Sequence, residues 1–449
     1  MDRDLIEKYA IAVPRYTSYP TAPHFHDGIG NATYASWLNE IEPDASLSLY
    51  FHIPYCDRLC WFCGCHTKHT LRYEPIATYL KALFAEISWV GKQLNGRGVV
   101  RAIHLGGGSP TMLTPADMLA LKAHLKRYFS FHRDAEISIE IDPNDLDEPR
   151  YDGMAAFGLT RASIGVQDFN PTVQKAINRI QTFEQTKAVV DAVRGRGVKS
   201  VNVDVLYGLP HQTIKTIEQT IAQVHALDPD RTALFGYAHV PWLKKHQQMI
   251  DESVLPDNFA RYEQARLAAD RLVESGMCAI GFDHFAKPGD TLAIAQRDGR
   301  LRRNFQGYTT DDADVLIGFG ASAIGKLPQG YIQNITATGE YQKHVLAEGS
   351  AVARGYALDH DDLLRSSVIE ALMCQFSFSR QDMADRFGAP ANRIFEEAST
   401  IARSDTDGLV FGSDTDFGLT ERGKPFVRVI ASKFDRYLGK GAARHSVAV

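Results

Sequence analysis

Short strand-like apolar runs alternate with amphipathic stretches between residue 47 and residue 237. The longer stretches repeat their apolar positions with the period of a helix, and the shorter runs have the length of strands. This regular alternation predicts parallel strands joined by helices. The expected strands are Leu47–Ile53, Val99–Leu105, Ala135–Ile141, Arg161–Gly165, Ser200–Leu206 and Thr232–Tyr237, and the clearest helices are Tyr79–Leu94, Pro115–Phe129, Thr182–Arg194 and Thr213–Leu227.

Six strand–helix units predict an α/β fold, namely an incomplete (β/α)6 barrel. A doubly wound sheet fits the same order of elements. In a barrel, ligands lie at the carboxyl ends of the strands. The glycine-rich and polar motifs of this chain do follow the expected strands, which favours the barrel.

The two ends of the chain have a different pattern, which divides the protein into segments 1–46, 47–350 and 351–449. The first segment is an arm rich in Tyr and Pro, with one short helix expected at Tyr34–Ile41. In the last segment we expect three helices, a small hairpin and a further helix, an arrangement that resembles a winged helix. The three helices are expected at Leu363–Met373, Ser379–Phe387 and Asn392–Arg403.

Composition and charge exclude several classes of protein. The 449 residues carry a net charge of −5, and the last segment has no basic stripe, so nucleic acid is not an expected partner. The sequence contains no run of about 18 apolar residues, so no membrane span is expected. Its first residues have no apolar core of the length found in signal peptides. We therefore expect a cytoplasmic protein, and a monomer.

Four of the six cysteines lie between residues 56 and 65, directly after the first expected strand. The spacing C-x3-C-x2-C of Cys56, Cys60 and Cys63 predicts a metal site, because thiolates suit iron–sulfur clusters and zinc. Structural zinc usually takes four ligands from two separated pairs, and no second pair exists here. Three thiolates on a [4Fe–4S] cluster leave one iron open, and an open iron can chelate the amino and carboxylate groups of S-adenosylmethionine (SAM). Ligation by all four cysteines, Cys65 included, remains possible on spacing alone.

Polar residues follow the next strands. The stretch HLGGGSPT, residues 104–111, can bring a ligand close to the backbone and leave N–H groups free for a carboxylate. Glu140 ends the third strand, Gln167 and Asp168 follow the fourth, and Asp204 lies in the fifth. A lone Glu is usually a surface ion pair, and glycines at a strand end often only form a turn. Their shared position at the strand ends favours a common site.

These motifs together resemble the family of oxygen-independent coproporphyrinogen III oxidases, radical SAM enzymes of haem biosynthesis. The similarity extends from residue 15 to about residue 325. Ser109 stands where the family often has Thr, which keeps the hydroxyl group. The matching stretches are RYTSYPTAPHF, YFHIPYCDRLCWFCGC, HLGGGSPT, IEIDP, GVQDFNPTVQKAINRIQ, NVDVLYGLP, YAHVPW, GFDHFAKP and RRNFQGYTT.

The resemblance implies a reaction and its cofactors. Two propionates of coproporphyrinogen III would be oxidatively decarboxylated to vinyl groups, giving protoporphyrinogen IX, with an electron donor for the cluster and a terminal acceptor as further partners. It implies a [4Fe–4S] cluster on the three cysteines and two SAM molecules side by side. The cluster-bound SAM would contact Tyr50, Gly107, Glu140, Ala238 and Ile324, and the second would contact Phe62, Gly108, Ser109, Gln167, Arg179 and Asp204.

Other roles follow less directly from the residues. Cys65 is expected not to bind the cluster, but it is a candidate for a role in turnover. Arg15, Lys68, Arg179, Arg302 and Arg303 are candidates for binding propionate. We also expect the arm to close the barrel over the substrate.

Three other classes of protein remain as alternatives. They are a haem-binding or haem-trafficking relative, a radical SAM enzyme that degrades haem, and a winged-helix regulator with a sensory cluster. The haem-trafficking relatives usually lack the fourth cysteine and the YTSYPTA leader, and both are present here.

Overall fold

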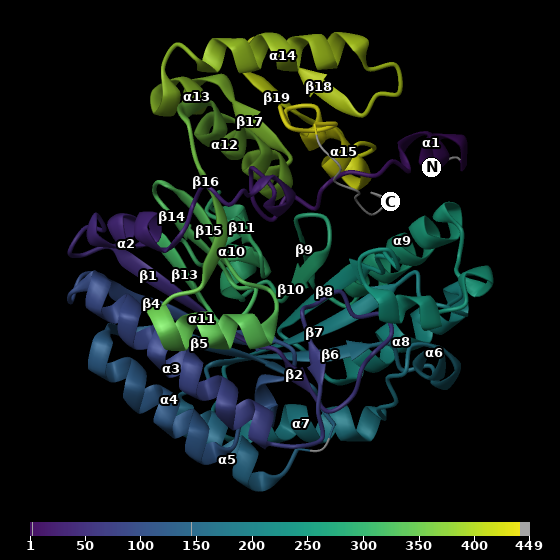
Figure 1. Cartoon of the computed structure of the whole chain (residues 1–449). Helices are drawn as coiled ribbons and strands as arrows, with labels where there is room; N and C mark the ends of the chain where they lie inside the picture. The colour runs from purple at the N-terminus through teal and green to yellow at the C-terminus, as the bar shows by residue number, and fades with distance from the viewer. Residues whose placement is uncertain (2, 145, 441–449) are drawn as a thin grey trace.

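The computed structural model describes residues 1, 3–144 and 146–440. It has a large sheet wrapped on its outer side by helices, a smaller domain above the sheet, and an N-terminal arm that passes between the two (Figure 1). Among the described residues, no helix is both long enough and apolar enough to cross a membrane.

Six parallel strands form the centre of the large sheet, and they are neighbours in the order in which they occur along the chain. An order without a reversal is that of a barrel and not of a doubly wound sheet, so the barrel interpretation is confirmed. Every predicted strand lies in one of these six, with ends that differ by at most five residues. They are β1 (Ser46–Ile53), β4 (Val99–Gly107), β5 (Ser130–Ile141), β6 (Arg161–Gln167), β7 (Ser200–Tyr207) and β8 (Arg231–Gly236).

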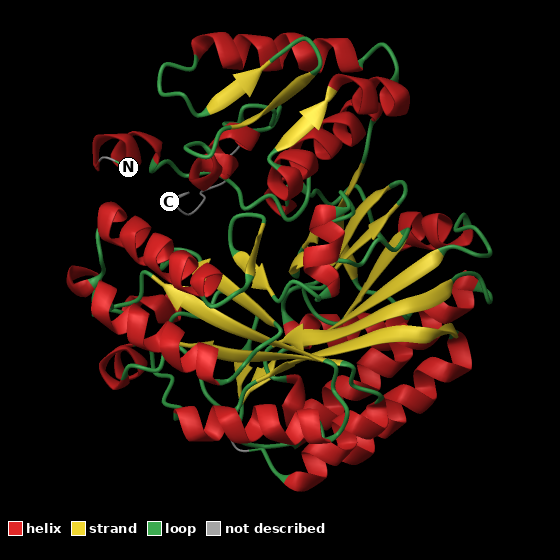
Figure 2. Ribbon diagram, turned by 180° about the vertical axis from the view of Figure 1, so that it is seen from behind, coloured by secondary structure: helices red, strands yellow, loops and turns green. Residues whose placement is uncertain are grey.

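Helices cover the outer face of this sheet (Figure 2). Side-chain oxygens of Thr114, Asp147, Thr182 and Thr213 cap four of them, which fixes where the chain leaves each loop. The four predicted helices are present, and three further ones, α5, α6 and α9, join the layer. The helices are α3 (Glu74–Leu94), α4 (Pro115–Tyr128), α5 (Glu148–Phe157), α6 (Pro171–Ala176), α7 (Phe183–Gly195), α8 (Ile214–Ala226) and α9 (Asn258–Glu274).

The sheet continues beyond the six predicted strands on both sides but does not close on itself. Next to β1 comes a parallel strand followed by three antiparallel ones: β13 (Val315–Phe319), β14 (Ile324–Leu327), β15 (Gly330–Asn334) and β16 (Val352–Ala357). Next to β8 lie the antiparallel strands β10 (His284–Ala286) and β9 (Cys278–Ile280). The sheet thus extends to Ala357, beyond residue 350, and the proposed division into segments stays a prediction. The connecting elements are α10 (Thr291–Arg297), β11 (Arg302–Asn304), β12 (Gly307–Thr309) and α11 (Thr338–Glu348).

The C-terminal domain has the predicted three helices and hairpin. The hairpin strands β18 (Val410–Gly412) and β19 (Asp416–Leu419) are antiparallel, and β19 also pairs with β17 (Ser377–Ser379), which was not predicted. Apolar side chains of the helices and strands form a core of their own. The helices are α12 (His360–Gln375), α13 (Arg380–Phe387), α14 (Ala391–Ser404) and α15 (Val427–Ser432).

The arm is packed against both domains. It contains α2 (Asn31–Asn39), which agrees with the predicted helix, and α1 (Arg3–Tyr9), which was not predicted. Tyr16 and Tyr19 are only 4% and 2% exposed and belong to the core of the C-terminal domain. Arg428 of α15 donates hydrogen bonds to the carbonyls of Pro14 (3.1 Å) and Val13 (2.6 Å). The arm is therefore a fixed part of the domain interface.

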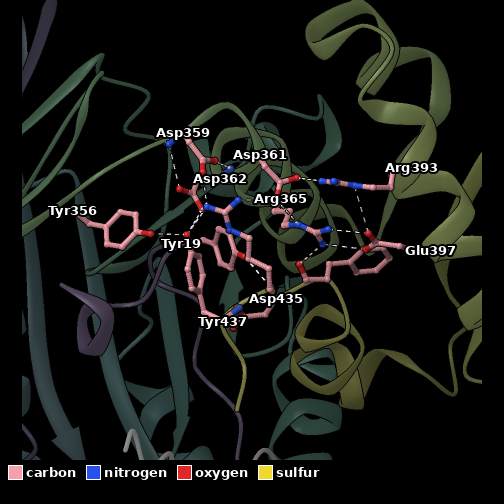
Figure 3. Close-up of polar contacts among 12 residues, drawn as sticks. Tyr19, Tyr356, Asp359, Asp361, Asp362, Arg365, Arg393, Glu397, Asp435 and Tyr437 are labelled. Carbon is pink, nitrogen blue, oxygen red and sulfur yellow. Dashed lines mark hydrogen bonds and ion pairs between the residues drawn. The ribbon is translucent and has the colours of Figure 1, made fainter. Parts of the chain in front are cut away.

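A network of charged and tyrosine side chains ties the C-terminal domain to the arm and the sheet (Figure 3). The Tyr19 hydroxyl accepts a hydrogen bond from the Arg436 amide (3.0 Å), and the hydroxyl of Tyr356 on β16 lies 2.6 Å from that of Tyr437. Because the interface is held by paired charges and buried rings, the position of the domain relative to the barrel is well determined. The remaining members of the network are Asp359, Asp361, Asp362, Arg365, Arg393, Glu397 and Asp435.

A buried carboxyl group joins α3 to the flanking part of the sheet. Glu86 accepts hydrogen bonds from the Gly320 amide (2.8 Å), the Asn334 side-chain amide (2.6 Å) and the Tyr341 hydroxyl (2.6 Å). Burial nevertheless raises the pKa of Glu86 to about 7, because the charged form loses its hydration.

We expect the free energy of unfolding to fall as the pH rises from about 4 to about 7 because of Glu86. A carboxyl whose pKa is raised on folding keeps its proton longer in the folded state. The contribution of Glu86 to the free energy of unfolding is therefore complete at a pH below the pKa of the unfolded state. It is lost as the pH rises through the pKa of the folded state, a change of roughly 3 kcal/mol. Urea unfolding at about pH 5 and about pH 8 measures the free energy of unfolding of wild type and of Glu86→Gln. The amount by which wild type exceeds the variant should be smaller at the higher pH. The exposed Glu340→Gln is the control, and a gap that is constant with pH would contradict the prediction.

Candidate active site

The cysteine loop lies at the carboxyl end of β1 and is closed by two short parallel strands, β2 (Tyr55–Cys56) and β3 (Lys68–His69). The polypeptide is anchored on one side by the turn after α6. The Trp61 amide donates to the Ile177 carbonyl (2.9 Å), and the Asn178 side chain donates to the Leu59 carbonyl (2.9 Å). The positions of Cys60 and Cys63 are thus fixed by the backbone around them.

The other side of the loop is held by the segment that follows β8, which includes a short 3-10 helix at Lys245–Met249. Three of its side chains bond to loop carbonyls: His246 to Cys63 (2.7 Å), Gln247 to Phe62 (3.0 Å) and Lys244 to Cys65 (3.0 Å). Sequence reasoning missed these residues. The available signal was the polar run directly after the YAHVPW motif, which contains the fully buried Gln247.

Hydrogen-bond donors contact two of the three cysteine sulfurs. Arg179 Nη1 donates to Cys60 Sγ (3.6 Å) and forms an ion pair with Asp142 (2.9 Å), and the Cys65 amide donates to Cys63 Sγ (3.4 Å). Burial raises the pKa of Cys56 and Cys60, whereas a hydrogen bond from Cys65 lowers the pKa of Cys63 to about 7.

The donor set fits a multinuclear cluster. In the described part of the chain, no three His, Cys, Asp or Glu side chains are grouped tightly enough to hold a single metal ion. Thiolates that bind separate irons of a cluster need not converge on one point. Cys56, Cys60 and Cys63 would hold the cluster, with N–H donors already aimed at two of their sulfurs.

The glycine-rich stretch packs directly on the cysteine loop, and the expectation of free backbone N–H groups is wrong. The amides of Gly108 and Ser109 donate to the carbonyls of Ile53 (2.8 Å) and Tyr55 (2.7 Å), and the Gly107 amide donates to Glu140 (2.9 Å). A side chain at Gly108 would place its Cβ 2.6 Å from the Tyr55 oxygen. Glycine is needed here because two backbone segments touch, and the amides of Gly107, Gly108 and Ser109 are already used within the protein.

Glu140 is an ionised carboxylate that faces the site. Its side chain is 41% exposed and also accepts a hydrogen bond from His104 Nε2 (3.1 Å). Burial opposes ionisation, but the His104 hydrogen bond and charge and the Gly107 amide outweigh it, so the pKa of Glu140 lies below its usual value. A negative charge is thereby retained beside the glycine stretch.

Tyr50 and His52 join β1 to this carboxylate and to the cysteine loop. The Tyr50 ring is stacked on His104 with 5.8 Å between centroids, and its hydroxyl bonds to His52 Nδ1 (3.0 Å). His52 Nε2 bonds to the His66 carbonyl (2.8 Å), so both ring nitrogens are used. Burial lowers the pKa of His52. These contacts give His52 a structural role.

Two further polar residues lie on β6 and β7. Asp204 accepts hydrogen bonds from Asn202 (2.8 Å) and Ser163 (3.3 Å), and burial raises the pKa of Asp204 to about 6. Gln167 ends β6 with a positive φ of 66°, a conformation that non-glycine residues rarely adopt. Its side-chain nitrogen lies over Gly165, where a Cβ would be only 2.9 Å away. Asp168 instead is fully buried among Gln212, Thr220 and the Asn170 amide, where it holds the loop.

The other predicted contact residues lie around the same strand ends. Ser109 is buried and bonds to Thr111 (2.9 Å), and Phe62 packs against an apolar cluster beneath the cysteine loop. The Ala238 carbonyl, directly after β8, accepts from Gln247 (3.2 Å). Ile324 begins β14, and its carbonyl lies against Gly318, the residue paired with Tyr50. Strand pairing thus brings residues that are far apart in sequence to one edge.

Two of the predicted basic residues lie side by side on β11. Arg303 is buried against the Tyr308 ring (4.5 Å) and lies 3.8 Å from Asp283. Arg302 is exposed, 3.9 Å from Glu370 on α12. Arg302 is thus part of the contact with the C-terminal domain, whereas Nε and Nη1 of Arg303 are buried without a hydrogen-bond partner among the described residues.

Comparisons with known proteins agree with this geometry. The model of the radical SAM superfamily matches residues 50–224. The chain is 47% identical over 437 residues, 97% of each chain, to the oxygen-independent coproporphyrinogen III oxidase of Bradyrhizobium diazoefficiens, and 46% identical over 438 residues, 97% of this chain and 96% of the relative, to that of Paracoccus denitrificans. Among solved structures it is similar to the coproporphyrinogen III oxidase of Escherichia coli, described as a radical SAM enzyme, with a TM-score of 0.91, 38% identity and coverage of 97% and 99% of the two chains.

Proposed function

The chain belongs to the oxygen-independent coproporphyrinogen III oxidase family, and on that premise we propose that it decarboxylates two propionates of coproporphyrinogen III to vinyl groups. The product is protoporphyrinogen IX. The observation that carries the proposal is the three-cysteine loop, which lies at the same sheet edge as the Glu140 carboxylate, in a chain similar to these enzymes over nearly its whole length.

The cofactors are a [4Fe–4S] cluster on Cys56, Cys60 and Cys63 and SAM at the neighbouring strand ends. When bound, they would supply the abstraction of a hydrogen atom from the β-carbon of a propionate, and the electron released together with carbon dioxide would pass to a terminal acceptor. Arg179 and the Cys65 amide donate to two ligand sulfurs and stabilise their negative charge. Cys65 lies outside the ligand set, and its thiol is a candidate for turnover.

We propose two SAM sites within this region. Tyr50, Gly107, Glu140, Ala238 and Ile324 serve the first, where the ionised Glu140 can hold a cationic or hydroxyl group of the ligand. Asp204 lies on the neighbouring side, half-buried and partly neutral near pH 6, and can accept from or donate to a ligand hydroxyl. It belongs to the second site together with Phe62, Gly108, Ser109, Gln167 and Arg179.

Replacing Glu140 with Gln should weaken SAM binding by about ten-fold or more, because a charged hydrogen-bond acceptor is lost. The side-chain oxygen that accepts from Gly107 is retained, so the melting temperature should change little. Calorimetric titration of the reconstituted protein with SAM measures the effect. Glu136→Gln is the control, since Glu136 lies on the same strand but is paired with Arg161 (2.7 Å) away from the site. Unchanged SAM affinity with a large loss of melting temperature in Glu140→Gln would make Glu140 structural.

The reaction itself is tested by anaerobic reconstitution followed by SAM, a reductant and coproporphyrinogen III. Mass spectrometry should show loss of two carboxyl groups from an intact macrocycle. An opened macrocycle would indicate a haem-degrading activity instead, and an unchanged substrate would contradict the proposal.

A further inference from the structure

A cavity of about 740 Å³ adjoins the proposed active site. It lies between α9, the β9–β10 hairpin and the C-terminal domain, which face one another across the mouth of the sheet (Figure 1). One wall is the Gly236–His239 segment directly after β8, which includes the proposed SAM contact Ala238. The cavity and the strand-end site therefore share a boundary.

Four arginines line this cavity, Arg15, Arg261, Arg266 and Arg428, and two of them hold the segment that follows β8. Arg15 of the arm donates to the Gly236 carbonyl (2.9 Å), and Arg261 of α9 donates to the Tyr237 carbonyl (2.9 Å). Within the described residues, neither guanidinium forms an ion pair with a carboxylate. Each therefore retains donors for a ligand, because a guanidinium has five N–H groups.

The carboxylates around the cavity already have cationic partners. Asp270 is paired with Arg266 (3.4 Å), Glu274 with Arg271 (2.6 Å) and Glu421 with Lys424 (2.6 Å). Asp283 attracts Arg15 electrostatically, but its oxygen is bonded to His284 (2.6 Å) and lies 3.8 Å from Arg303. Arg15 and Arg261 are thus left without a direct ion pair among the described residues, and Asp283 acts on Arg15 only through its charge.

The surroundings disfavour the charged forms of Arg15 and Arg261. Burial lowers the pKa of Arg15 and Arg261, and the neighbouring charges of Arg303 and Arg261 lower that of Arg15 further. Arg15 is nevertheless solvent-exposed, because its side chain faces the open cavity. Arg428 holds the two carbonyls before Arg15 and acts as a positioning residue. Guanidinium groups that keep free N–H donors at a cavity wall are suited to bind carboxylates.

Several aromatic residues also line the cavity. Tyr207, Phe235, Tyr237, Phe282, Phe285 and Phe376 contribute rings from the sheet and from both domains. Such walls favour a large, partly apolar ligand that carries acidic groups at its periphery. A porphyrinogen with four propionates has this chemistry.

We infer that this cavity binds the macrocycle of the substrate and that Arg15 and Arg261 each bind one propionate carboxylate. The inference rests on the proposed function. Two carboxylates held on this side orient the macrocycle so that the other propionates face the strand ends beyond Ala238. The arm thus contributes a substrate ligand, Arg15, and not only a cover.

The test uses coproporphyrin III, the stable oxidised macrocycle with the same four propionates, in fluorescence titrations of the reconstituted protein. Arg15→Gln and Arg261→Gln should each weaken its binding about ten-fold or more, as expected for a lost charged hydrogen bond. SAM binding should be unchanged, and KM for coproporphyrinogen III should rise more than kcat falls. Arg271→Gln is the matched control, because Arg271 is on the same helix and is paired with Glu218 and Glu274. The tetramethyl ester of coproporphyrin III should bind equally weakly to wild type and both variants.

The results distinguish a failure of the proposed carboxylate site from a failure of the proposed function. Unchanged binding of the tetra-acid in Arg261→Gln, or equal binding of the acid and its ester to wild type, would overturn the inference while leaving decarboxylation intact. If Arg15→Gln does not fold, Arg261→Gln and Arg261→Lys still decide, since lysine keeps the charge and should restore part of the affinity. A wild-type protein that binds the tetra-acid through both arginines but forms no vinyl product would overturn the proposed function and support the carboxylate site.

Discussion

Serine in place of Cys56, Cys60 or Cys63 is expected to remove the iron–sulfur cluster and all turnover, whereas Cys65→Ser keeps the iron. A three-cysteine cluster already has an open iron, so it has no spare ligand to replace a missing thiolate. Serine binds iron poorly at such a site because soft thiolates are the preferred ligands. Cys65 instead contributes its amide to Cys63 Sγ, a contact that serine retains.

Iron and sulfide content after anaerobic reconstitution, with the visible absorption of the cluster, measures this result. Cys278→Ser is the control, since Cys278 is an exposed thiol on β9, away from the loop. Decarboxylation should be undetectable in the three ligand variants and normal in the control. Equal loss of iron in Cys65→Ser and in the ligand variants would show that four cysteines bind the metal.

Deleting residues 1–25 is expected to destabilise the C-terminal domain and to abolish decarboxylation. Tyr16 and Tyr19 complete the core of that domain, and Leu5, Ile6 and Val13 cover Leu409, Phe426 and Val429. Removing a single buried aromatic side chain costs about 3–5 kcal/mol, and here two are removed together with an apolar cluster. The domain should therefore unfold well before the barrel.

Limited proteolysis with identification of the fragments, together with thermal unfolding, measures this effect. Cleavage should begin after residue 357, where the sheet ends. Thr17→Ala, a half-buried position of the arm outside the apolar clusters, should behave as wild type. A truncated protein with normal melting and protease resistance would show that the arm is only a cover. Because the arm is packed into two apolar clusters, Arg15→Gln is the sharper test of its role toward the substrate.

The central fold was predictable because its signals are local. Each of the six parallel strands is a compact apolar run followed by an amphipathic helix, and both patterns depend on neighbours a few residues away. The strands that extend the sheet, β9, β10 and β13–β16, were not predicted. They have three to six residues and include several glycines, and so short a run carries little periodicity.

The site was predictable where the chemistry lies within one stretch of sequence. The spacing of Cys56, Cys60 and Cys63 alone limits the metal chemistry, and the resemblance named Glu140 and Asp204. The role of the glycine stretch was misjudged, because its amides bond to the cysteine loop and to Glu140 across the sheet. No local pattern reveals which backbone a glycine will touch.

By itself, the sequence determined the order of strands and helices, the cysteine spacing and the family, because each depends on residues that are close in the chain or on motifs read one at a time. Only the tertiary structure decided that Lys244, His246 and Gln247 hold the cysteine loop, that the arm is part of two apolar cores, and that Arg15 and Arg261 face one cavity without carboxylate partners among the described residues. Burial, pairing and pKa are set by groups that folding brings together from distant segments. Arg15 and Arg261 are separated by 246 residues and yet bond to adjacent carbonyls, those of Gly236 and Tyr237.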